Sequence, residues 1–174
     1  MNTLPNHLAL KEWSSVVAAL GTGEQVILIR KGGIADPTFG LEGQRFYLYP
    51  TYFHQGEAEA RSSITITLWC EAVRTWSIRD LDLLYRLAPL SVMPRATLDA
   101  RYRFRPDQAL NVIALRTWKL ADAVDIAFKD KYAGCLSWIS LDDEIDIDGS
   151  TPVLTHAQLD AKIESVEARL TVAV

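Results

Sequence analysis

Basic residues and glycines follow one another near residue 30, and they are the first candidates for chemistry. Arg30 and Lys31 directly precede Gly32 and Gly33. Glycine lets backbone N–H groups approach an anion closely, while Arg and Lys supply positive charge and hydrogen-bond donors. The order is not that of a P-loop, in which lysine follows the last glycine and precedes Ser or Thr. The pattern indicates either a phosphate or carboxylate site or a tight turn with solvated basic side chains.

Polar side chains in the next ordered segment extend this candidate site. Arg45 supplies a guanidinium, and Tyr52, His54 and Gln55 supply groups that donate or accept hydrogen bonds. His54 can serve as a general base or as a phosphate donor, because histidine changes its protonation state near neutral pH. A structural hydrogen-bonding role for it is the alternative. The predicted ligand-binding site comprises Arg30, Lys31, Gly32, Gly33, Arg45, Tyr52, His54 and Gln55.

A second basic segment, at residues 101–105, alternates arginine with aromatic residues, and Arg95 precedes it. Such alternation is typical of surfaces that follow a nucleic-acid backbone and stack on bases. The structural alternative is that the aromatic residues anchor a helix end while the arginines pair with carboxylates. Arg101 and Arg103 are therefore secondary candidates.

The segment around Cys135 contains three further secondary candidates. Cys135 and His54 form a nucleophilic pair only if folding brings them together and lowers the pKa of the thiol. Ser137 and Trp138 can line the same pocket as His54, although a tryptophan in a strand contributes mainly through burial. We therefore favour a buried cysteine and a core Trp138.

Several well-known sites do not fit this sequence. Residues 144–149 resemble the first half of an EF-hand, but Thr155 stands where the bidentate Glu belongs and Pro152 falls inside the loop. Asp160 and Lys162 have the spacing of a nuclease motif. They lie on the exposed face of the predicted final helix, where such charges need no catalytic explanation. No Gly-x-Ser-x-Gly elbow occurs. We predict neither a metal nor a cofactor.

Composition limits the class of protein. The chain has 174 residues, a net charge of −4 and 49% hydrophobic residues, which predicts one globular domain over residues 1–174. It lacks the overall basic excess of a dedicated nucleic-acid binder, so an anion-binding surface must be local. Neither a membrane-spanning stretch nor a signal segment is recognisable, and Cys70 and Cys135 lack metal-ligand spacing. We therefore expect a cytoplasmic protein with reduced thiols.

The elements that must position these residues follow from hydrophobic periodicity. The first half of the chain predicts a helix over residues 8–20, strands over 25–30, 45–49 and 63–73, and a short helix over 52–61. In the second half, Ser77 and Asp80 predict a capping box and a helix, and another helix follows Pro94. Strands are expected at 109–120 and 135–141, with an extended connection over 122–131.

The final helix has the strongest local signal. Thr155 and Gln158 form a capping box, and the apolar residues from Leu159 to Leu170 recur at helical spacing. Strands and helices alternate too irregularly for repeated βαβ units. We therefore predict an α+β fold in which helices, including N- and C-terminal ones, pack on a mixed or antiparallel sheet. A partly closed barrel is one form of such a sheet.

Four spaced motifs resemble one family over nearly the whole chain: LKEW at 10–13, LIRKGGI at 28–34, FYLYPTYFHQ at 46–55 and YAGCLSW at 132–138. The chain thereby resembles the bacterial domain of unknown function DUF1802. Members are sometimes associated with restriction-endonuclease-like domains, so the resemblance implies a nucleic-acid context. It implies no catalytic residue.

The leading hypothesis is an accessory, non-catalytic domain that binds an anionic ligand, either a nucleotide or nucleic acid. One alternative is a phosphoester- or acyl-processing enzyme with His54 as its base. Another is a scaffold that forms homo-oligomers through tryptophan-bearing faces. No membrane partner is predicted.

Overall fold

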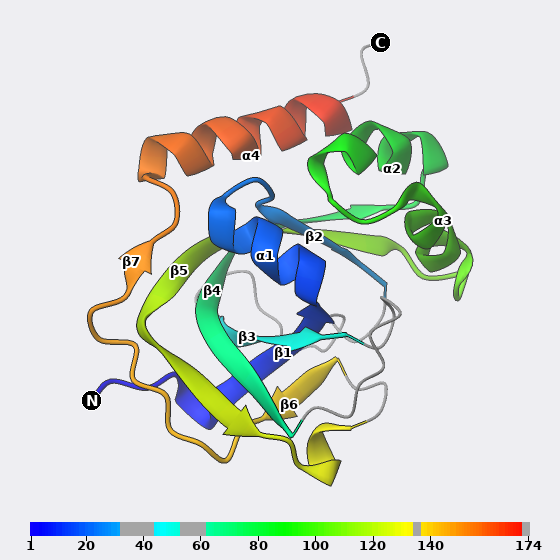
Figure 1. Ribbon diagram of the computed structural model, residues 1–174. Helices are drawn as coiled ribbons and strands as arrows, with labels where there is room; N and C mark the ends of the chain where they lie inside the picture. Colours follow the sequence, from blue (N-terminus) through cyan, green and yellow to red (C-terminus); the bar gives the residue numbers. More distant parts are fainter. Residues whose placement is uncertain (32–43, 53–61, 134–136, 172–174) are drawn as a thin grey trace.

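A curled mixed sheet forms the framework of the protein in a computed structural model that describes residues 1–31, 44–52, 62–133 and 137–171 (Figure 1). The strand order is β2-β5-β4-β3-β1-β6, with β7 paired to β5. Among the described strands, only β1 and β3 pair in parallel. The strands are β1 (Leu8–Trp13), β2 (Ile27–Arg30), β3 (Arg45–Thr51), β4 (Ser63–Ile78), β5 (Leu110–Ala127), β6 (Trp138–Ser140) and β7 (Thr151–Pro152).

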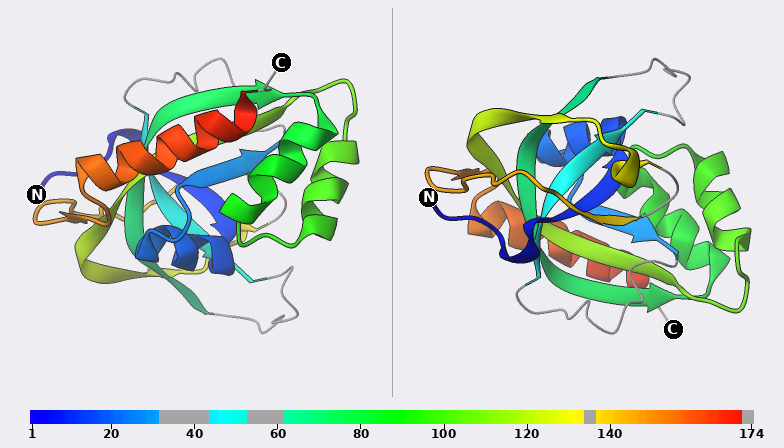
Figure 2. Two further views of the ribbon diagram at one scale, coloured as in Figure 1. Left: turned by 90° about the horizontal axis from the view of Figure 1, so that it is seen from above. Right: turned by 90° about the horizontal axis from the view of Figure 1, so that it is seen from below.

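Helices pack around this sheet, as expected for an α+β fold. They are α1 (Ser14–Thr22), α2 (Leu81–Leu87), α3 (Arg95–Arg103) and α4 (His156–Leu170), with the short 3₁₀ helices η1 (Pro5–His7), η2 (Ala88–Leu90) and η3 (Asp130–Tyr132). Figures 1 and 2 show α2 and α3 side by side at one end of the sheet, and α4 above the long strands. Among the described residues, no helix has the length and apolarity needed to cross a membrane.

The two long strands serve two hydrophobic cores. Leu68, Cys70 and Ala72 of β4 belong to the core that also contains α1 and part of α4, whereas Ile64 and Ile66 belong to a second core. The register of β4 against β5 shifts between Ile66 and Leu68. Such an irregularity changes the direction in which side chains point and increases the local twist. One strand can therefore supply both cores.

In the strand predicted over residues 63–73, every second residue from Ile64 to Ala72 is apolar, but these residues do not share one core, and Trp69 between them is also buried. Ile64, Ile66, Leu68, Cys70 and Ala72 are all buried, yet they are divided between the two cores. The strand also extends beyond Val73 to Ile78, pairing with β5 along this length. Pairing with a long neighbour supplies backbone partners where the side-chain pattern alone does not predict a strand.

The predicted helix over residues 8–20 is wrong in its first half. Residues 8–13 form β1, which pairs with β3 on one side and β6 on the other. The helix α1 begins at Ser14 and buries Val16, Val17, Ala19 and Leu20. The helical spacing of the apolar residues therefore does not decide the structure of residues 8–13, because two neighbouring strands satisfy their backbone groups.

Other boundaries also depend on distant partners. The strand β5 runs to Ala127, so the connection predicted over 122–131 is wrong up to that point. The capping box predicted from Ser77 and Asp80 is wrong, because Ser77 lies within β4. Asp80 instead caps α2 by accepting from the N–H of Asp82 at 2.7 Å. The capping box of Thr155 and Gln158 at α4 is confirmed. Most of the helix predicted at 52–61 lies outside the described residues, as does the start of the strand predicted at 135–141.

A buried tyrosine ties the N-terminal segment to the second core. The Tyr47 hydroxyl donates to the carbonyl of Ile145 at 2.7 Å and accepts from the N–H of Leu4 at 3.1 Å. Tyr49, two residues along the same strand, is also buried, but its hydroxyl has no hydrogen-bond partner among the described residues. Burial raises the pKa of Tyr49 to about 12. Burial raises the pKa of Tyr47 as well, so both phenols are neutral at physiological pH, but among the described residues only Tyr47 has a hydrogen-bond partner.

These two tyrosines give a matched test of the second core. Tyr47→Phe should lower the free energy of unfolding by about 1–3 kcal/mol, because it leaves a buried N–H and a buried C=O unpaired. Tyr49→Phe should have little effect or be stabilising, because it removes a hydroxyl that has no described partner. Urea denaturation measures both. Equal effects of the two substitutions would contradict the assigned hydrogen bonds.

Candidate functional site

A buried carboxylate, Glu12, lies at the centre of the candidate site. The residue is 2% exposed near the end of β1. Its Oε2 lies 2.7 Å from Nη1 of Arg30, and its Oε1 lies 3.6 Å from Nη2 of Arg101. The N–H of Trp13 donates to Oε1 at 2.9 Å. A buried carboxylate requires such partners, because its desolvation otherwise costs several kcal/mol.

Arg30 joins elements from opposite ends of the strand order. It ends β2, and its Nη1 also donates to the carbonyl of Lys11 in β1 at 3.0 Å. Its Nη2 donates to Oγ of Ser137, just before β6, at 3.0 Å. The planar guanidinium has donors on both sides and can make these contacts together. Arg30 therefore links β2 to β1 and β6, although β2 pairs along its backbone with β5.

Arg101 brings α3 to the same place. Its Nη1 donates to the carbonyl of Ile29 in β2 at 2.6 Å, and its guanidinium lies 5.9 Å from the centre of the Trp13 ring. Burial lowers the pKa of Arg101, an effect that the negative charge of Glu12 opposes and the positive charge of Arg30 reinforces. The ammonium of Lys31 donates to the carbonyl of Tyr102. Several contacts therefore hold α3 against the end of β2.

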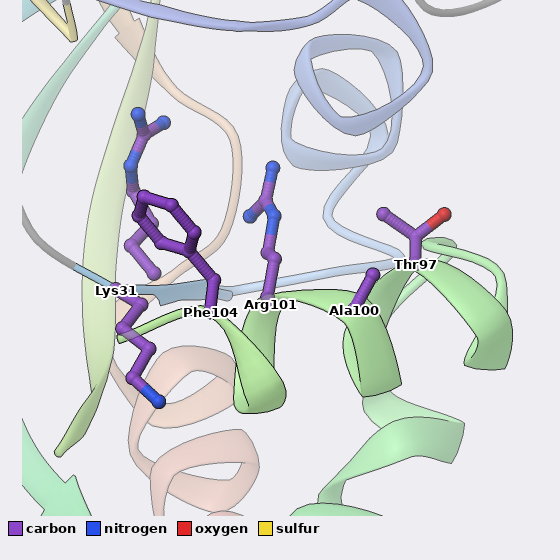
Figure 3. A pocket seen from close by; sticks show the side chains of 6 residues that line it. Lys31, Thr97, Ala100, Arg101 and Phe104 are labelled. Carbon is purple, nitrogen blue, oxygen red and sulfur yellow. The ribbon is translucent and has the colours of Figure 1, made fainter. Parts of the chain in front are cut away.

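A pocket of about 310 Å³ lies between β2 and α3. Its lining comprises Arg30, Lys31, Thr97, Ala100, Arg101 and Phe104. Ala100, Arg101 and Phe104 follow Thr97 by three, four and seven residues, so these residues of α3 and its C-cap Phe104 lie on one side of the helix. In Figure 3, Lys31 and Arg101 extend in opposite directions, and the Phe104 ring lies on the same side as the Arg101 guanidinium.

Among the described residues, the pocket lining stays positively charged after its ion pairs are considered. Two arginines share the single carboxylate of Glu12, and Lys31 adds a third cation. Hydrogen bonds fix each cation in position, yet an arginine has five N–H donors and a lysine three. Their contacts with described residues use only part of these donors. The pocket therefore offers positioned cations to an anion.

The structure brings some of the predicted site residues together and separates others. Arg30 and Lys31 line the pocket with the secondary candidate Arg101, and Ser137 contacts Arg30. Arg103, in the last turn of α3, is exposed. Arg45 instead lies 3.6 Å from Glu71 and over the ring of Trp69, and no described contact links it to Arg30.

The other candidate residues either pack on the hydrophobic cores or lie outside the described part of the chain. Tyr52 is partly buried and packs on the second core. Trp138 packs edge to face on Phe46 at 5.1 Å between ring centres, which agrees with the favoured core role. Gly32, Gly33, His54, Gln55 and Cys135 lie outside the described residues. Cys70 is buried, and burial raises its pKa to about 12, so this thiol is protonated at neutral pH.

Sequence reasoning did not identify Glu12, Thr97 or Ala100 as site residues. A carboxylate among the apolar residues of LKEW was the only local signal for Glu12. For α3, the helical spacing of Thr97, Ala100, Arg101 and Phe104 defines one face, but nothing in the sequence says that β2 lies opposite. Among the described residues, no group of three or more His, Cys, Asp or Glu side chains is arranged to hold a metal ion.

Solved structures of an ASCH protein from Zymomonas mobilis resemble this fold. A tyrosine-to-phenylalanine variant of that protein has a TM-score of 0.50 and 10% sequence identity, over 91% of this chain and 96% of that chain. Another structure of the ASCH protein has a TM-score of 0.46 and 10% identity, over 90% of this chain and 93% of that chain. At such identities the first likeness concerns the fold alone, and it agrees with a curled α+β sheet.

The family comparison agrees with the four sequence motifs. The family described as "Domain of unknown function (DUF1802)" matches residues 9–165. This range includes Glu12, Arg30 and the whole of α3. No curated protein sequence matches the chain significantly.

Replacing Glu12 tests whether the buried ion pairs hold the site together. Glu12→Gln should lower the free energy of unfolding by about 3–5 kcal/mol, because it leaves the largely buried Arg30 and Arg101 guanidiniums without a counter-charge. The exposed Arg74–Glu167 pair supplies a control. Glu167→Gln should cost less than about 1 kcal/mol. Similar midpoints in chemical denaturation for the two variants would contradict a central role for Glu12.

Proposed function

The chain belongs to the DUF1802 family, and we propose that it is an accessory, non-catalytic cytoplasmic domain that binds a phosphate-bearing ligand, a nucleotide or nucleic acid. The binding site in this proposal is the pocket between β2 and α3. Its cations are Arg30, Lys31 and Arg101. The proposal replaces Arg45 of the sequence-based site with Arg101, because Arg101 shares the carboxylate of Glu12 with Arg30.

The meeting of two basic segments is the observation that carries this proposal. Lys31 and Tyr102, which are 71 positions apart in the sequence, are joined by a hydrogen bond. Taken alone, the first segment is also explained as a tight turn with solvated basic side chains, and the second as aromatic residues that anchor a helix end beside paired arginines. Their convergence on one pocket, with an exposed aromatic ring at its edge, is typical of surfaces that contact a phosphate backbone and its bases.

The charge distribution also supports a local anion site. The whole chain carries a net charge of −4, which repels a polyanion at long range. Binding therefore depends on short-range contacts with positioned donors, such as those of Arg101 and Lys31. Guanidinium groups that are already fixed by protein contacts lose less conformational entropy when they bind a phosphate.

The chemistry of the lining residues favours binding over catalysis. The pocket supplies guanidinium, ammonium, one hydroxyl from Thr97 and hydrocarbon surface. Arginine keeps its proton at physiological pH and does not serve as a general base. Such a set of groups binds and orients an anion.

Salt-dependent binding of a fluorescent single-stranded oligonucleotide tests the proposal. Affinity should fall as salt rises, because bound phosphates release counterions. Lys31→Gln should weaken binding and lower the slope of log Kd against log salt by about one, the effect of losing one phosphate contact. Fluorescence anisotropy over a series of salt concentrations gives both quantities.

Arg45→Gln is the matched control, because it removes one positive charge from outside the pocket. It should leave the slope close to that of the unaltered protein. A larger effect of Arg45→Gln than of Lys31→Gln would place the anion site on β3 and refute the proposed pocket. Absence of binding to oligonucleotides, nucleotides and inorganic phosphate would refute the function itself.

A further inference from the structure

Phe104 is an aromatic side chain in an unusual environment. It is 56% exposed, although it lines the pocket beside Arg30 and Arg101. The other large hydrophobic residues exposed in the described part of the chain are Met1, Val92 and Phe128. None of these lines the same pocket. Single exposed apolar residues are common, so exposure alone assigns no role to Phe104.

The backbone around Phe104 provides a second, independent observation. The N–H of Phe104 donates to the carbonyl of Ala100 at 3.0 Å and so holds the backbone of Phe104 at the end of α3. Arg105 has a φ of 49°, in the left-handed region that residues other than glycine rarely adopt. Its guanidinium lies 5.0 Å from the centre of the Phe104 ring. Backbone strain of this kind persists where the surrounding structure holds it, often at functional sites.

Resting on the proposed function, we infer that Phe104 is a stacking platform for an unpaired nucleobase, so that the ligand is a single strand of nucleic acid. An aromatic ring attracts any base through its π face. The Arg105 guanidinium lies over the ring and the pocket lies beside it. A base that entered the pocket would therefore contact both the ring and the positioned cations.

The positions of the cations favour a strand over an isolated phosphate. Arg101 and Lys31 extend in opposite directions from the pocket, with Phe104 on the side of Arg101 (Figure 3). A nucleotide within a strand carries a phosphate on each side of its sugar. Because the two cations extend to different sides, they can contact different phosphates of one strand that passes Phe104. Bases within a duplex are already stacked and paired, so duplex binding at Phe104 would require a base to be unstacked.

The pocket size agrees with one base. A volume of about 310 Å³ is at the lower end of the range for ligand pockets, roughly 300–1,000 Å³. Thr97 and Ala100 are small side chains on the α3 face of the pocket, and they leave space beside the ring of Phe104. A single nucleotide is therefore a more suitable occupant than the end of a helix.

The test compares a short oligothymidylate with a strand of equal length and charge that lacks bases. Phe104→Ala should weaken binding of the oligothymidylate by about tenfold, the effect of losing one stacked base. It should leave binding of the abasic strand unchanged. Phe104→Trp should retain or strengthen binding of the oligothymidylate, because the indole also stacks. Phe128→Ala is the control at another exposed phenylalanine and should leave both affinities unchanged.

Two further measurements complete the experiment. A duplex of the same length should bind more weakly than the single strand, and oligouridylate compared with oligodeoxyuridylate of equal length shows whether the strand is RNA or DNA. Circular dichroism and thermal unfolding verify that each variant folds, as expected for substitutions at an exposed side chain.

The outcomes separate this inference from the function on which it rests. If Lys31→Gln alters the salt dependence but Phe104→Ala changes no affinity, the stacking platform is refuted and the anion site stands. Equal weakening of the normal and abasic strands by Phe104→Ala also refutes stacking, because the ring would then act on the pocket and not on a base. If no phosphate-bearing probe binds the unaltered protein, both proposals are refuted.

Discussion

The buried carboxylate of Glu12 imposes the constraint on which the rest of the site depends. A charge removed from water requires a counter-charge and hydrogen-bond donors close by. Glu12 obtains them from Arg30 of β2, Arg101 of α3 and the backbone of Trp13. Three elements that are distant in the sequence must therefore meet at one point. Arg30 extends this connection to the carbonyl of Lys11 and the hydroxyl of Ser137.

The same arrangement connects stability with the proposed binding. Arg30 and Arg101 neutralise Glu12, but two guanidiniums exceed the charge of one carboxylate. The fold thus holds a positive site in a chain whose net charge is negative. Because protein contacts already fix the two guanidiniums, a phosphate would meet donors in position. Replacing either arginine therefore alters both its ion pair with Glu12 and the lining of the pocket. Substitutions of Lys31 or Phe104 change the pocket without removing a partner of Glu12, so they separate the effect on binding from the effect on stability.

The curled sheet explains how these elements approach one another. The strands β4 and β5 are long and irregular in register, and each contributes to two cores. Twist and bulges allow a sheet to curl so that strands far apart in its order come near. In this protein β2 and β1 are separated in the strand order by β5, β4 and β3, yet Arg30 contacts Glu12. The curvature of the sheet is therefore a condition for the pocket.

The sequence by itself determined the features that depend on near neighbours. The capping box of α4, the apolar run of β2, the alternation in β4 and the two basic segments follow from adjacent residues, and four motifs identified the family. Only the tertiary structure decided that residues 8–13 form a strand, that β5 continues to Ala127, and that Arg101, not Arg45, accompanies Arg30. These features depend on strand pairing and ion pairing between residues far apart in the chain, and no local pattern specifies which distant partner a backbone group or a buried charge will find.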